Sequence, residues 1–248
     1  MRLNYVDRGK CQIVFAGDDP EVVYKLPMAP RYLSAVDAAR AEAGRAQRTG
    51  RWAWTRRVQL RAQLLTNRGA MQRSAAILER LGQTAAGGCG RFFPETRVVA
   101  LKRAELVVAG REFRYSGFAL RQALVTDFFE RDTPLDSFDW GELRDVVTGL
   151  WRQGVGMASV ADTWGQKNWG RDVHGRVRLI DTSHLSEDLE QVQARVAPGA
   201  TEELERKLVA RGAGSPAQVR CYFETLARDL NPERLRALWR SDLDSARG

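Results

Sequence analysis

The sequence is poor in the residues on which disulfide, metal-thiolate and histidine chemistry depend. Its 248 residues include three cysteines and two histidines. Cys11, Cys89 and Cys221 are odd in number and far apart, and no Cys-x-x-Cys or Cys/His pair has metal spacing. His174 and His184 are not accompanied by a Gly-x-Ser-x-Gly motif. We therefore expect reduced, structural thiols, and we set aside a zinc cluster and a Ser-His-Asp hydrolase.

Long apolar runs are also missing. A membrane-spanning helix needs about 18 consecutive apolar residues, and the sequence has no such run. The first residues, MRLNYVDRGKCQIVF, lack the continuous apolar segment of a secretion signal, so we expect a cytoplasmic protein. With 44% hydrophobic and 28% charged residues, the chain has the composition of a globular protein. Its length allows one large domain or two small lobes that share a cleft.

Lysine is absent and acidic residues are rare in one part of the chain. Residues 31–80 hold eleven arginines, no lysine and three acidic residues, an excess of eight positive charges. The net charge of the whole chain is also +8, so the other residues sum to about zero. Arginines interleaved with Trp52 and Trp54 are compatible with nucleic-acid binding, with an anionic substrate, with an acidic membrane surface and with a solvated helical face. Because no helix-turn-helix, zinc-finger or RNA-binding signature is present, nucleic acid is the less favoured partner.

Strand and helix patterns alternate through the first half of the chain. Short β-rich runs separated by turn residues predict a three-stranded antiparallel meander over residues 2–27. A further strand pair is predicted over residues 96–125. Between them, Ala, Leu, Arg and Gln with apolar returns at three and four residues predict helices over residues 34–81, interrupted at TNRGA.

The second half reads as mostly helical. The segment TPLDSFDWGELRDVVTGLWRQG predicts an amphipathic helix that Asp139 caps and Gly154 ends. Further helical patterns follow Asp181 as far as the C-terminus. We therefore expect an α+β protein with an antiparallel β lobe over residues 1–125, which carries the helical insert, and an α-helical lobe over residues 126–248.

The stretch ADTWGQKNWGRDVHGRVRLIDTSHL, residues 161–185, carries the most specific chemistry. The turn DVHG followed by the alternating strand RVRLID predicts a hairpin, which brings Asn168 and Asp181 toward the same end. Amide and carboxylate oxygens are hard ligands suited to Mg²⁺. Mg²⁺ usually retains several water ligands and is bound by one or two protein carboxylates and by substrate phosphates. A site with only one Asp and one Asn therefore fits a nucleotide–metal complex better than a structural metal site.

A cation for the phosphates is expected at Lys25. This lysine lies in the otherwise apolar strand EVVYKLP, where burying it is costly unless it is paired. Glu42, seventeen residues later on the first predicted helix, is a candidate partner. Glu79, on the helix just before the next strand, is the alternative.

The order of the strand VVYK, a loop that ends in Asn168 and a strand that ends in Asp181 resembles the protein-kinase-like superfamily. In that superfamily a strand lysine, a catalytic loop of the type His-Arg-Asp-x-x-x-x-Asn and an Asp-Phe-Gly motif carry out phosphoryl transfer. The resemblance covers residues 4–189 at the level of element order. The sequence most resembles small atypical bacterial members of the superfamily, such as the YrbL-like proteins of the PhoP regulatory network and the aminoglycoside-phosphotransferase-like kinases. It implies a two-lobed fold that binds ATP–Mg²⁺ in its cleft and transfers the γ-phosphoryl group to a hydroxyl acceptor.

The resemblance also implies roles for individual residues. Lys25 would contact the α- and β-phosphates, and Glu42 would hold the lysine in place. Asp162 would be the catalytic-loop aspartate, which orients the acceptor hydroxyl or accepts its proton. Asn168 and Asp181 would bind Mg²⁺.

The nucleotide itself would contact two further segments. Gly9, in the stretch VDRGKCQIVF, would belong to the hairpin over the phosphates. Gln122 and Ala123, which follow the strand YSGFAL, would lie near the hinge, where an adenine ring bonds to backbone.

The sequence also departs from the family pattern. Gly9 is the only glycine of the phosphate hairpin, and Asp162 precedes Asn168 by six residues, one more than usual. An alignment without a gap puts Thr163 at the aspartate position. Thr-Ser follows Asp181 in place of Phe-Gly, and no Ala-Pro-Glu segment is present. Two alternative functions therefore stay open: an inactive pseudokinase that acts as a regulatory or binding module, and a nucleic-acid-binding protein that uses the Arg-rich helices.

Overall fold

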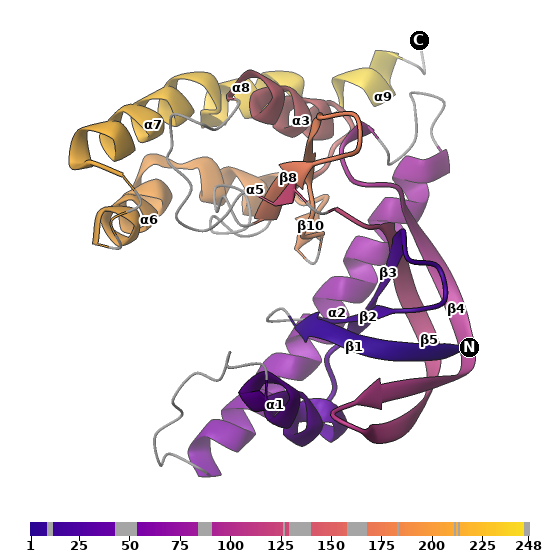
Figure 1. Cartoon of the computed structure of the whole chain (residues 1–248). Helices are drawn as coiled ribbons and strands as arrows, with labels where there is room; N and C mark the ends of the chain where they lie inside the picture. The colour runs from indigo at the N-terminus through magenta and orange to yellow at the C-terminus, as the bar shows by residue number, and fades with distance from the viewer. Residues whose placement is uncertain are drawn as a thin grey trace. The chain divides into compact units, whose positions relative to one another are not determined.

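The chain has a mixed α+β fold, with a five-stranded sheet in its N-terminal half and mainly helices in its C-terminal half (Figure 1). This is the coarse fold class that the sequence predicts. The computed structural model describes residues 1–8, 12–42, 54–83, 91–125, 127–128, 140–157, 168–182, 184–210, 212 and 214–245. The chain divides into two compact units, of which unit 1 is Met1–Glu79 with Glu95–Leu124 and unit 2 is Arg80–Pro94 with Val125–Gly248.

Unit 1 is built on a closed five-stranded barrel in the order β1-β2-β3-β5-β4. Its strands are β1 (Arg2–Arg8), β2 (Gln12–Ala16), β3 (Val22–Pro27), β4 (Thr96–Val108) and β5 (Arg111–Ala123). The antiparallel meander and the later strand pair are confirmed. The expectation of a purely antiparallel sheet is wrong at one pairing, because Leu3 of β1 lies beside Leu106 of β4 in a parallel ladder. This pairing joins the two outer strands and leaves the sheet without an open edge.

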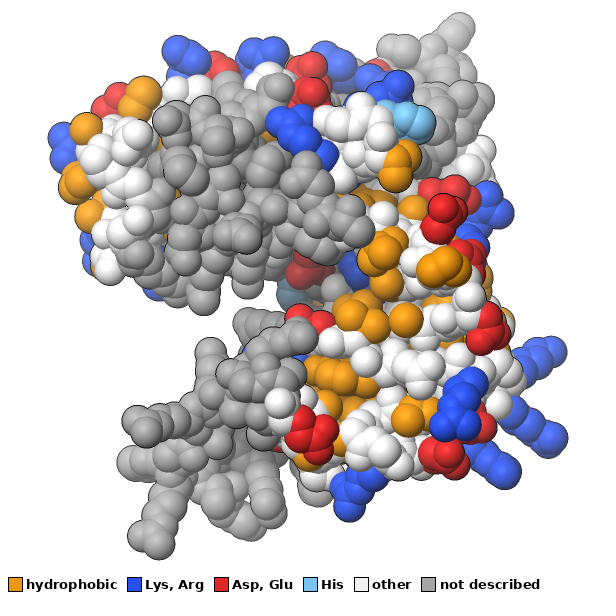
Figure 2. Space-filling view, viewed as in Figure 1, with side chains coloured by type: hydrophobic (Ala, Val, Ile, Leu, Met, Phe, Trp, Pro, Cys, Tyr) orange, Lys and Arg blue, Asp and Glu red, His pale blue; other side chains and the backbone are white. Residues whose placement is uncertain are grey.

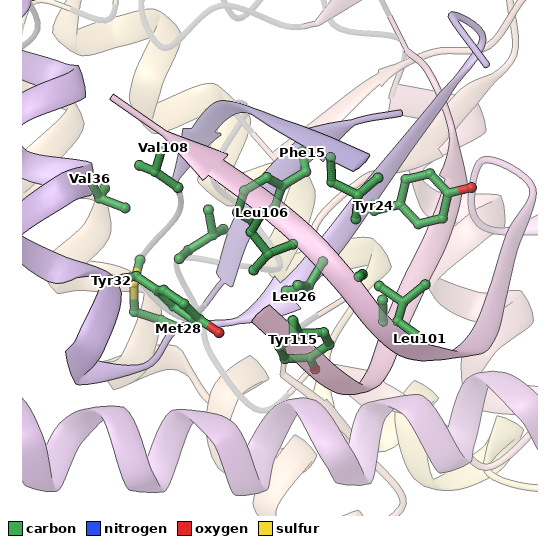
Figure 3. Packing of buried hydrophobic residues seen from close by; sticks show 14 of the residues in the cluster. Phe15, Tyr24, Leu26, Met28, Tyr32, Val36, Leu101, Leu106, Val108 and Tyr115 are labelled. Atoms are coloured by element: carbon green, nitrogen blue, oxygen red, sulfur yellow. The ribbon is translucent and has the colours of Figure 1, made fainter. Parts of the chain in front are cut away.

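Apolar side chains fill the interior of the barrel, because alternate residues of every strand point inward. Phe15, Tyr24, Leu26, Leu106 and Tyr115 come from four strands and are all buried (Figure 3). Each large apolar side chain buried in this way stabilises the fold by roughly 1.5–3 kcal/mol. The side chains of β3 between these positions, including Lys25, belong to the outer face of the barrel.

Two helical segments accompany the barrel in unit 1. The short helix η1 (Pro30–Tyr32) and the helix α1 (Leu33–Glu42) add Tyr32 and Val36 to the barrel core. The helix α2 (Trp54–Gln83) runs beside the strands in both views that show it (Figures 1 and 3).

The helix α2 is a single element of 30 residues, roughly 45 Å long. The predicted interruption at TNRGA is therefore wrong. The helix continues through Gly69, because one interior glycine costs only about 1 kcal/mol. Met71, Ser74, Ile77 and Leu78 recur at three and four residues beyond that glycine and are all buried, which holds this part of the helix in place.

Unit 2 combines helices with short strands. The predicted amphipathic helix is confirmed as α3 (Trp140–Arg152), and Gly154 follows it in the left-handed conformation with φ of 66°. Its predicted cap, Asp139, lies outside the described residues. The later helices are α5 (Leu189–Val196), α6 (Pro198–Ala210), α7 (Pro216–Asp229), α8 (Pro232–Leu238) and α9 (Ser241–Ser245).

The short strands of unit 2 form two small sheets. One has the order β6-β8-β9, with β6 (Asp127–Phe128), β8 (Trp169–Arg171) and β9 (Val177–Leu179). The other pairs β7 (Gly156–Met157) with β10 (Leu185–Ser186). Among the helices that the structure describes, none is long and apolar enough to cross a membrane.

Candidate functional site

The predicted hairpin around Asn168 and Asp181 is present in unit 2. Strands β8 and β9 pair antiparallel, with Trp169 opposite Leu179. One residue beyond this pair, the Ile180 N–H donates to the Asn168 carbonyl oxygen at 2.7 Å. Asp181 follows directly, so the register brings Asn168 and Asp181 to the same end of the hairpin, as the sequence predicts.

The far end of the hairpin is ordered by Asp172. Its Oδ1 accepts hydrogen bonds from the backbone N–H groups of His174 and Arg176 at 2.9 and 3.0 Å. Its Oδ2 lies 2.9 Å from the guanidinium of Arg178, a buried side chain on β9. Gly175 takes the left-handed conformation that this turn requires, with φ of 74°.

The surroundings of Asp172 also shift the pKa of its carboxyl. Partial burial raises the pKa of the carboxyl. The two backbone N–H donors and the Arg178 guanidinium act in the opposite direction and hold the pKa below its ordinary value. The carboxylate therefore stays charged at neutral pH and keeps the buried guanidinium paired.

Contacts from other elements of unit 2 hold the hairpin in place. The Val177 N–H donates to Glu142 Oε2 of helix α3 at 2.5 Å. The Leu179 N–H donates to the Phe92 carbonyl oxygen at 3.0 Å. The Trp169 side chain of β8 is fully buried. The hairpin is thus a rigid element, which is the kind of support that a binding residue needs.

The residues at the end of the hairpin match the oxygen chemistry of a magnesium site. Asn168 is buried and Asp181 is partly exposed. Thr182 is fully buried, and its Oγ1 has no hydrogen-bond partner in the described part of the chain. No group of three or more His, Cys, Asp and Glu side chains that could hold a metal lies within the described ranges. One carboxylate together with neutral oxygen donors is a set of ligands that Mg²⁺ accepts.

Lys25 lies on the outer face of the barrel in unit 1. It stands on β3 opposite Val14 of β2 and Leu120 of β5, and its side chain is 4% exposed. Directly paired residues share a face of a sheet. The same face therefore carries Gln12 and Gln122, two further buried polar side chains. Gln12, Lys25 and Gln122 are thus three polar side chains on the outer face of the barrel, and all three are buried by other parts of the chain. We call this face the Lys25 surface.

Gln12 is a member of this surface that the sequence reasoning missed. It lies two residues before Val14 on β2 and is therefore a diagonal neighbour of Lys25. Its Oε1 atom is buried and has no hydrogen-bond partner among the described residues. A buried acceptor left unpaired costs about 1–3 kcal/mol, which a bound donor would recover. In the sequence, Gln12 is only a polar residue at the start of an apolar run. A solvent-exposed glutamine would give the same pattern, so the sequence does not indicate that Gln12 is buried.

Gln122 and Ala123 are engaged within the fold. The Gln122 Nε2 donates to Thr96 Oγ1 at 3.0 Å. The Ala123 N–H donates to the Glu95 carbonyl oxygen at 2.8 Å, and the Leu124 N–H donates to the Glu21 carbonyl oxygen at 2.7 Å. The adenine contact at Gln122 and Ala123 stays a prediction. The Gln122 side-chain amide and the Ala123 backbone N–H each donate to an acceptor within unit 1.

The remaining predicted residues are distributed as follows. Glu42 is the last residue of α1 and Glu79 lies on α2, and both side chains are exposed. Which of the two pairs with Lys25 stays a prediction. Gly9 and Asp162, the expected phosphate-hairpin glycine and catalytic aspartate, lie outside the described residues.

Comparison with known proteins leaves the family open. No family model matches the chain, and no curated protein matches it. Among solved structures, two of the bifunctional kinase-methyltransferase WbdD match with TM-scores of 0.38 and 16% identity. They cover 90% and 93% of this chain but 44% and 46% of the matched chains.

A third solved structure, a co-crystal of WbdD with the kinase inhibitor LY294002, has a TM-score of 0.37 and 17% identity. It covers 92% of this chain and 46% of the matched chain. The present chain therefore spans less than half the length of these solved chains. At TM-scores this low, the likeness carries no argument about the site.

Proposed function

We propose that the chain is an ATP–Mg²⁺-dependent phosphotransferase that transfers the γ-phosphoryl group of ATP to a hydroxyl acceptor. The observation that carries the proposal is the β8–β9 register, in which Asn168 and Asp181 reach the same end of a rigid hairpin. A phosphoryl-transfer site needs oxygen ligands for a divalent cation and a fixed cation for the phosphates. The hairpin offers the first, and the buried Lys25 of β3 offers the second.

Each residue has a separate task in this proposal. Asp181 and Asn168 would hold Mg²⁺, which when bound neutralises charge on the phosphates. The Lys25 ammonium would orient the α- and β-phosphates. Gln12 Oε1 would accept a hydrogen bond from the bound nucleotide, since it is a buried acceptor on the same face as Lys25. Asp162 would orient the acceptor hydroxyl or take its proton.

Catalysis of this kind rests on positioning and on electrostatics, because phosphoryl transfer asks for little covalent chemistry from the protein. The β8–β9 hairpin meets the need for positioning, because contacts with other residues of unit 2 hold its backbone in place. Asp172 and Glu142 order its backbone without occupying the end that carries Asn168. A ligand held by pre-ordered groups loses less entropy on binding and reacts from a fixed position.

A thermal-shift titration with ATP, with and without Mg²⁺, tests the proposal. Ligand that binds only the folded state raises the melting temperature by mass action. We expect a Mg²⁺-dependent rise in the wild type that is lost in Asp181→Asn. Asp145→Asn is the matched control, because it removes the same charge from an exposed position on α3.

Turnover is measured next, as release or transfer of labelled γ-phosphate from ATP. Turnover that needs both Mg²⁺ and Asp181 supports the phosphotransferase. Mg²⁺-dependent ATP binding without turnover would point to a pseudokinase. Absence of any ATP-dependent shift at millimolar ATP would refute the nucleotide site itself.

A further inference from the structure

The pairing of β4 with β5 in unit 1 is interrupted by a β-bulge. The ladder shifts between Leu101 and Ala104 of β4, two residues whose side chains belong to the barrel core. Between them, Lys102 and Arg103 stand opposite the single residue Ser116 of β5, and both side chains are exposed. A bulge of this kind turns side chains in a new direction and is over-represented next to functional sites.

The backbone of the bulge is strained and is held in a defined conformation. Arg103 has a φ of 51°, in the left-handed region that residues other than glycine rarely adopt. The Arg103 N–H donates to Ser116 Oγ at 3.0 Å, which ties the bulge to the opposite strand. Backbone strain of this kind is concentrated at binding and catalytic positions, because the surrounding structure must stabilise it. The bulge therefore presents Lys102 and Arg103 in a fixed way.

A third cationic side chain lies on the same face of the β4–β5 ribbon. Arg114 is exposed and stands two residues before Ser116 on β5, so the two share a face. It pairs with Glu105 of β4, which makes Arg103 its diagonal neighbour, roughly 7–8 Å away. Figure 2 shows Lys and Arg side chains projecting at the edge of unit 1 along which Figure 1 draws β4. We call Lys102, Arg103 and Arg114 the bulge surface.

The positive charge of the bulge surface is not compensated within unit 1. In the part of the chain that the structure describes, none of its three side chains makes an ion pair. Another arginine of the same strand does, because Arg97 lies 2.7 Å from Glu95. The acid opposite Arg114 is Glu105, and it lies 3.1 Å from Arg2. A local excess of cations creates a positive potential that attracts anions.

The surroundings of the bulge surface restrict the kind of anionic partner. Over residues 96–123, all of which the structure describes, no large apolar side chain is exposed, aromatic ones included. A protein interface needs an apolar core, and three cations without apolar insertion gain only about 3 kcal/mol at an anionic membrane. A single nucleic-acid strand binds by stacking its bases on exposed aromatic rings. A double-stranded nucleic acid needs neither, because its closely spaced phosphates bind cations directly.

We propose that the bulge surface binds the phosphate backbone of a double-stranded nucleic acid. The guanidinium groups of Arg103 and Arg114 suit paired hydrogen bonds to phosphate oxygens, and Lys102 adds a point charge. Contacts to phosphates position a protein on a duplex without reading its sequence. The bulge surface is separate from the Lys25 surface, because its three side chains are exposed whereas Lys25 is buried on β3. The proposal therefore does not rest on phosphoryl transfer.

Fluorescence anisotropy of a short labelled DNA duplex, titrated with the full-length protein without Mg²⁺ or ATP, tests the proposal. Each phosphate contact contributes about −0.9 to the slope of log affinity against log salt concentration, so three contacts predict a roughly fortyfold loss of affinity between about 50 and 200 mM sodium chloride. Each of Lys102→Met, Arg103→Gln and Arg114→Gln should make the slope shallower by about 0.9, and the triple variant by about 2.7. Wild-type salt dependence in the triple variant would overturn the proposal, as would the absence of duplex binding at about 50 mM salt.

Further variants separate binding from folding and from net charge. Arg103→Gly removes the charge and suits the left-handed backbone, so its midpoint of urea unfolding should equal or exceed that of the wild type while its duplex binding matches that of Arg103→Gln. Arg103→Lys keeps the charge and should restore the salt slope. Arg220→Gln, at an exposed position of α7, is the matched control and should change the affinity less than twofold. Equal weakening by Arg220→Gln would show that only net charge matters and would contradict a defined surface.

Competition distinguishes a duplex from other polyanions. Unlabelled duplex should displace the labelled one, and a single strand with the same number of phosphates should displace it less well, because no exposed aromatic side chain of the β4–β5 ribbon offers stacking. Vesicles that contain phosphatidylserine should compete poorly for the same reason that apolar insertion is lacking. Tighter binding of the single strand or of the vesicles than of the duplex, lost in the triple variant, would overturn the proposal and assign the bulge surface to that partner.

Discussion

The Ile180 N–H donates to the Asn168 carbonyl oxygen at 2.7 Å, one residue beyond the paired ends of β8 and β9. This bond extends the ladder by one step, so that Ile180 lies opposite Asn168 and Asp181 follows as the next residue. The two oxygen-bearing side chains that the sequence separates by a dozen residues therefore occupy one end of a two-stranded element. The proposed Mg²⁺ site of unit 2 depends on that register.

The first prediction concerns the turn of this hairpin. Asp172→Asn removes the negative charge that pairs with the buried Arg178. We expect it to lower the free energy of unfolding at pH 7 by about 2 kcal/mol, because a buried charge loses its partner. Urea unfolding monitored by circular dichroism measures the loss. Asp145→Asn, on the exposed surface of α3, should change it by less than about 0.5 kcal/mol.

The same variant should also change the acid dependence of stability. A carboxyl whose folded-state pKa is lowered contributes fully above its unfolded pKa of about 3.9 and loses that contribution as the pH falls through the folded pKa. The difference between wild type and Asp172→Asn should therefore shrink below about pH 4. A difference that stays constant from pH 7 to pH 3 would show that the charge of Asp172 is not the cause.

The second prediction concerns Lys25. Lys25→Met keeps an unbranched side chain on the outer face of β3 and removes the ammonium. We expect ATP affinity to fall at least tenfold, or about 1.4 kcal/mol, while the far-ultraviolet circular dichroism stays that of the wild type. Lys102→Met, at an exposed position of β4, is the control and should bind ATP normally. Wild-type affinity in Lys25→Met would remove this lysine from the nucleotide site.

The third prediction separates stability from binding at Thr182. Thr182→Val removes a buried hydroxyl that has no hydrogen-bond partner in the described structure. The free energy of unfolding without ligand should rise by about 1 kcal/mol, because an unpaired polar group is no longer buried. The Mg²⁺-dependent shift in melting temperature with ATP should fall, because an oxygen donor beside Asp181 is lost.

Thr148→Val provides the matched control for Thr182. The Thr148 hydroxyl is also buried in unit 2, but it donates to the Arg144 carbonyl oxygen at 2.8 Å. Its removal should lower the free energy of unfolding by about 1 kcal/mol and leave the nucleotide response unchanged. If both threonine variants lose stability equally, Thr182 has a partner in solution and does not serve a ligand.

The fourth prediction concerns packing beneath the β7–β10 pair. A Cβ on Gly156 would lie 2.4 Å from Val192 Cγ1, a buried and branched side chain on α5. Gly156→Ala should therefore lower the free energy of unfolding by about 1–3 kcal/mol. Val192→Ala opens space at the contact, so the double variant should be more stable than the sum of the single effects predicts. Additive effects in this double-mutant cycle would mean that the backbone moves to relieve the contact.

Local patterns accounted for most of the elements. Alternation of apolar and polar residues predicts the strands of the barrel, and apolar returns at three and four residues predict α3 and the later helices. The turn residues DVHG and the strand RVRLID were enough to predict the β8–β9 hairpin. These signals work because neighbouring residues in the chain decide the local backbone conformation.

The same local signals failed where distant contacts decide. A glycine within TNRGA indicated a helix break, yet buried packing beyond Gly69 carries α2 through it. No local pattern singled out Gln12, yet it is buried on the face of the barrel that carries Lys25. Burial depends on what covers a residue, and the covering residues are far away in the sequence.

The sequence by itself determined most of the strand and helix segments, the charge excess of the Arg-rich insert and the hairpin that brings Asn168 and Asp181 to one end. Only the tertiary structure decided that β1 lies parallel to β4 and closes the barrel. It alone placed Gln12 among the buried side chains on the face of the barrel that carries Lys25. The physical reason is the same in both cases: such contacts join residues many positions apart, and they form because the whole chain must bury its apolar side chains at once.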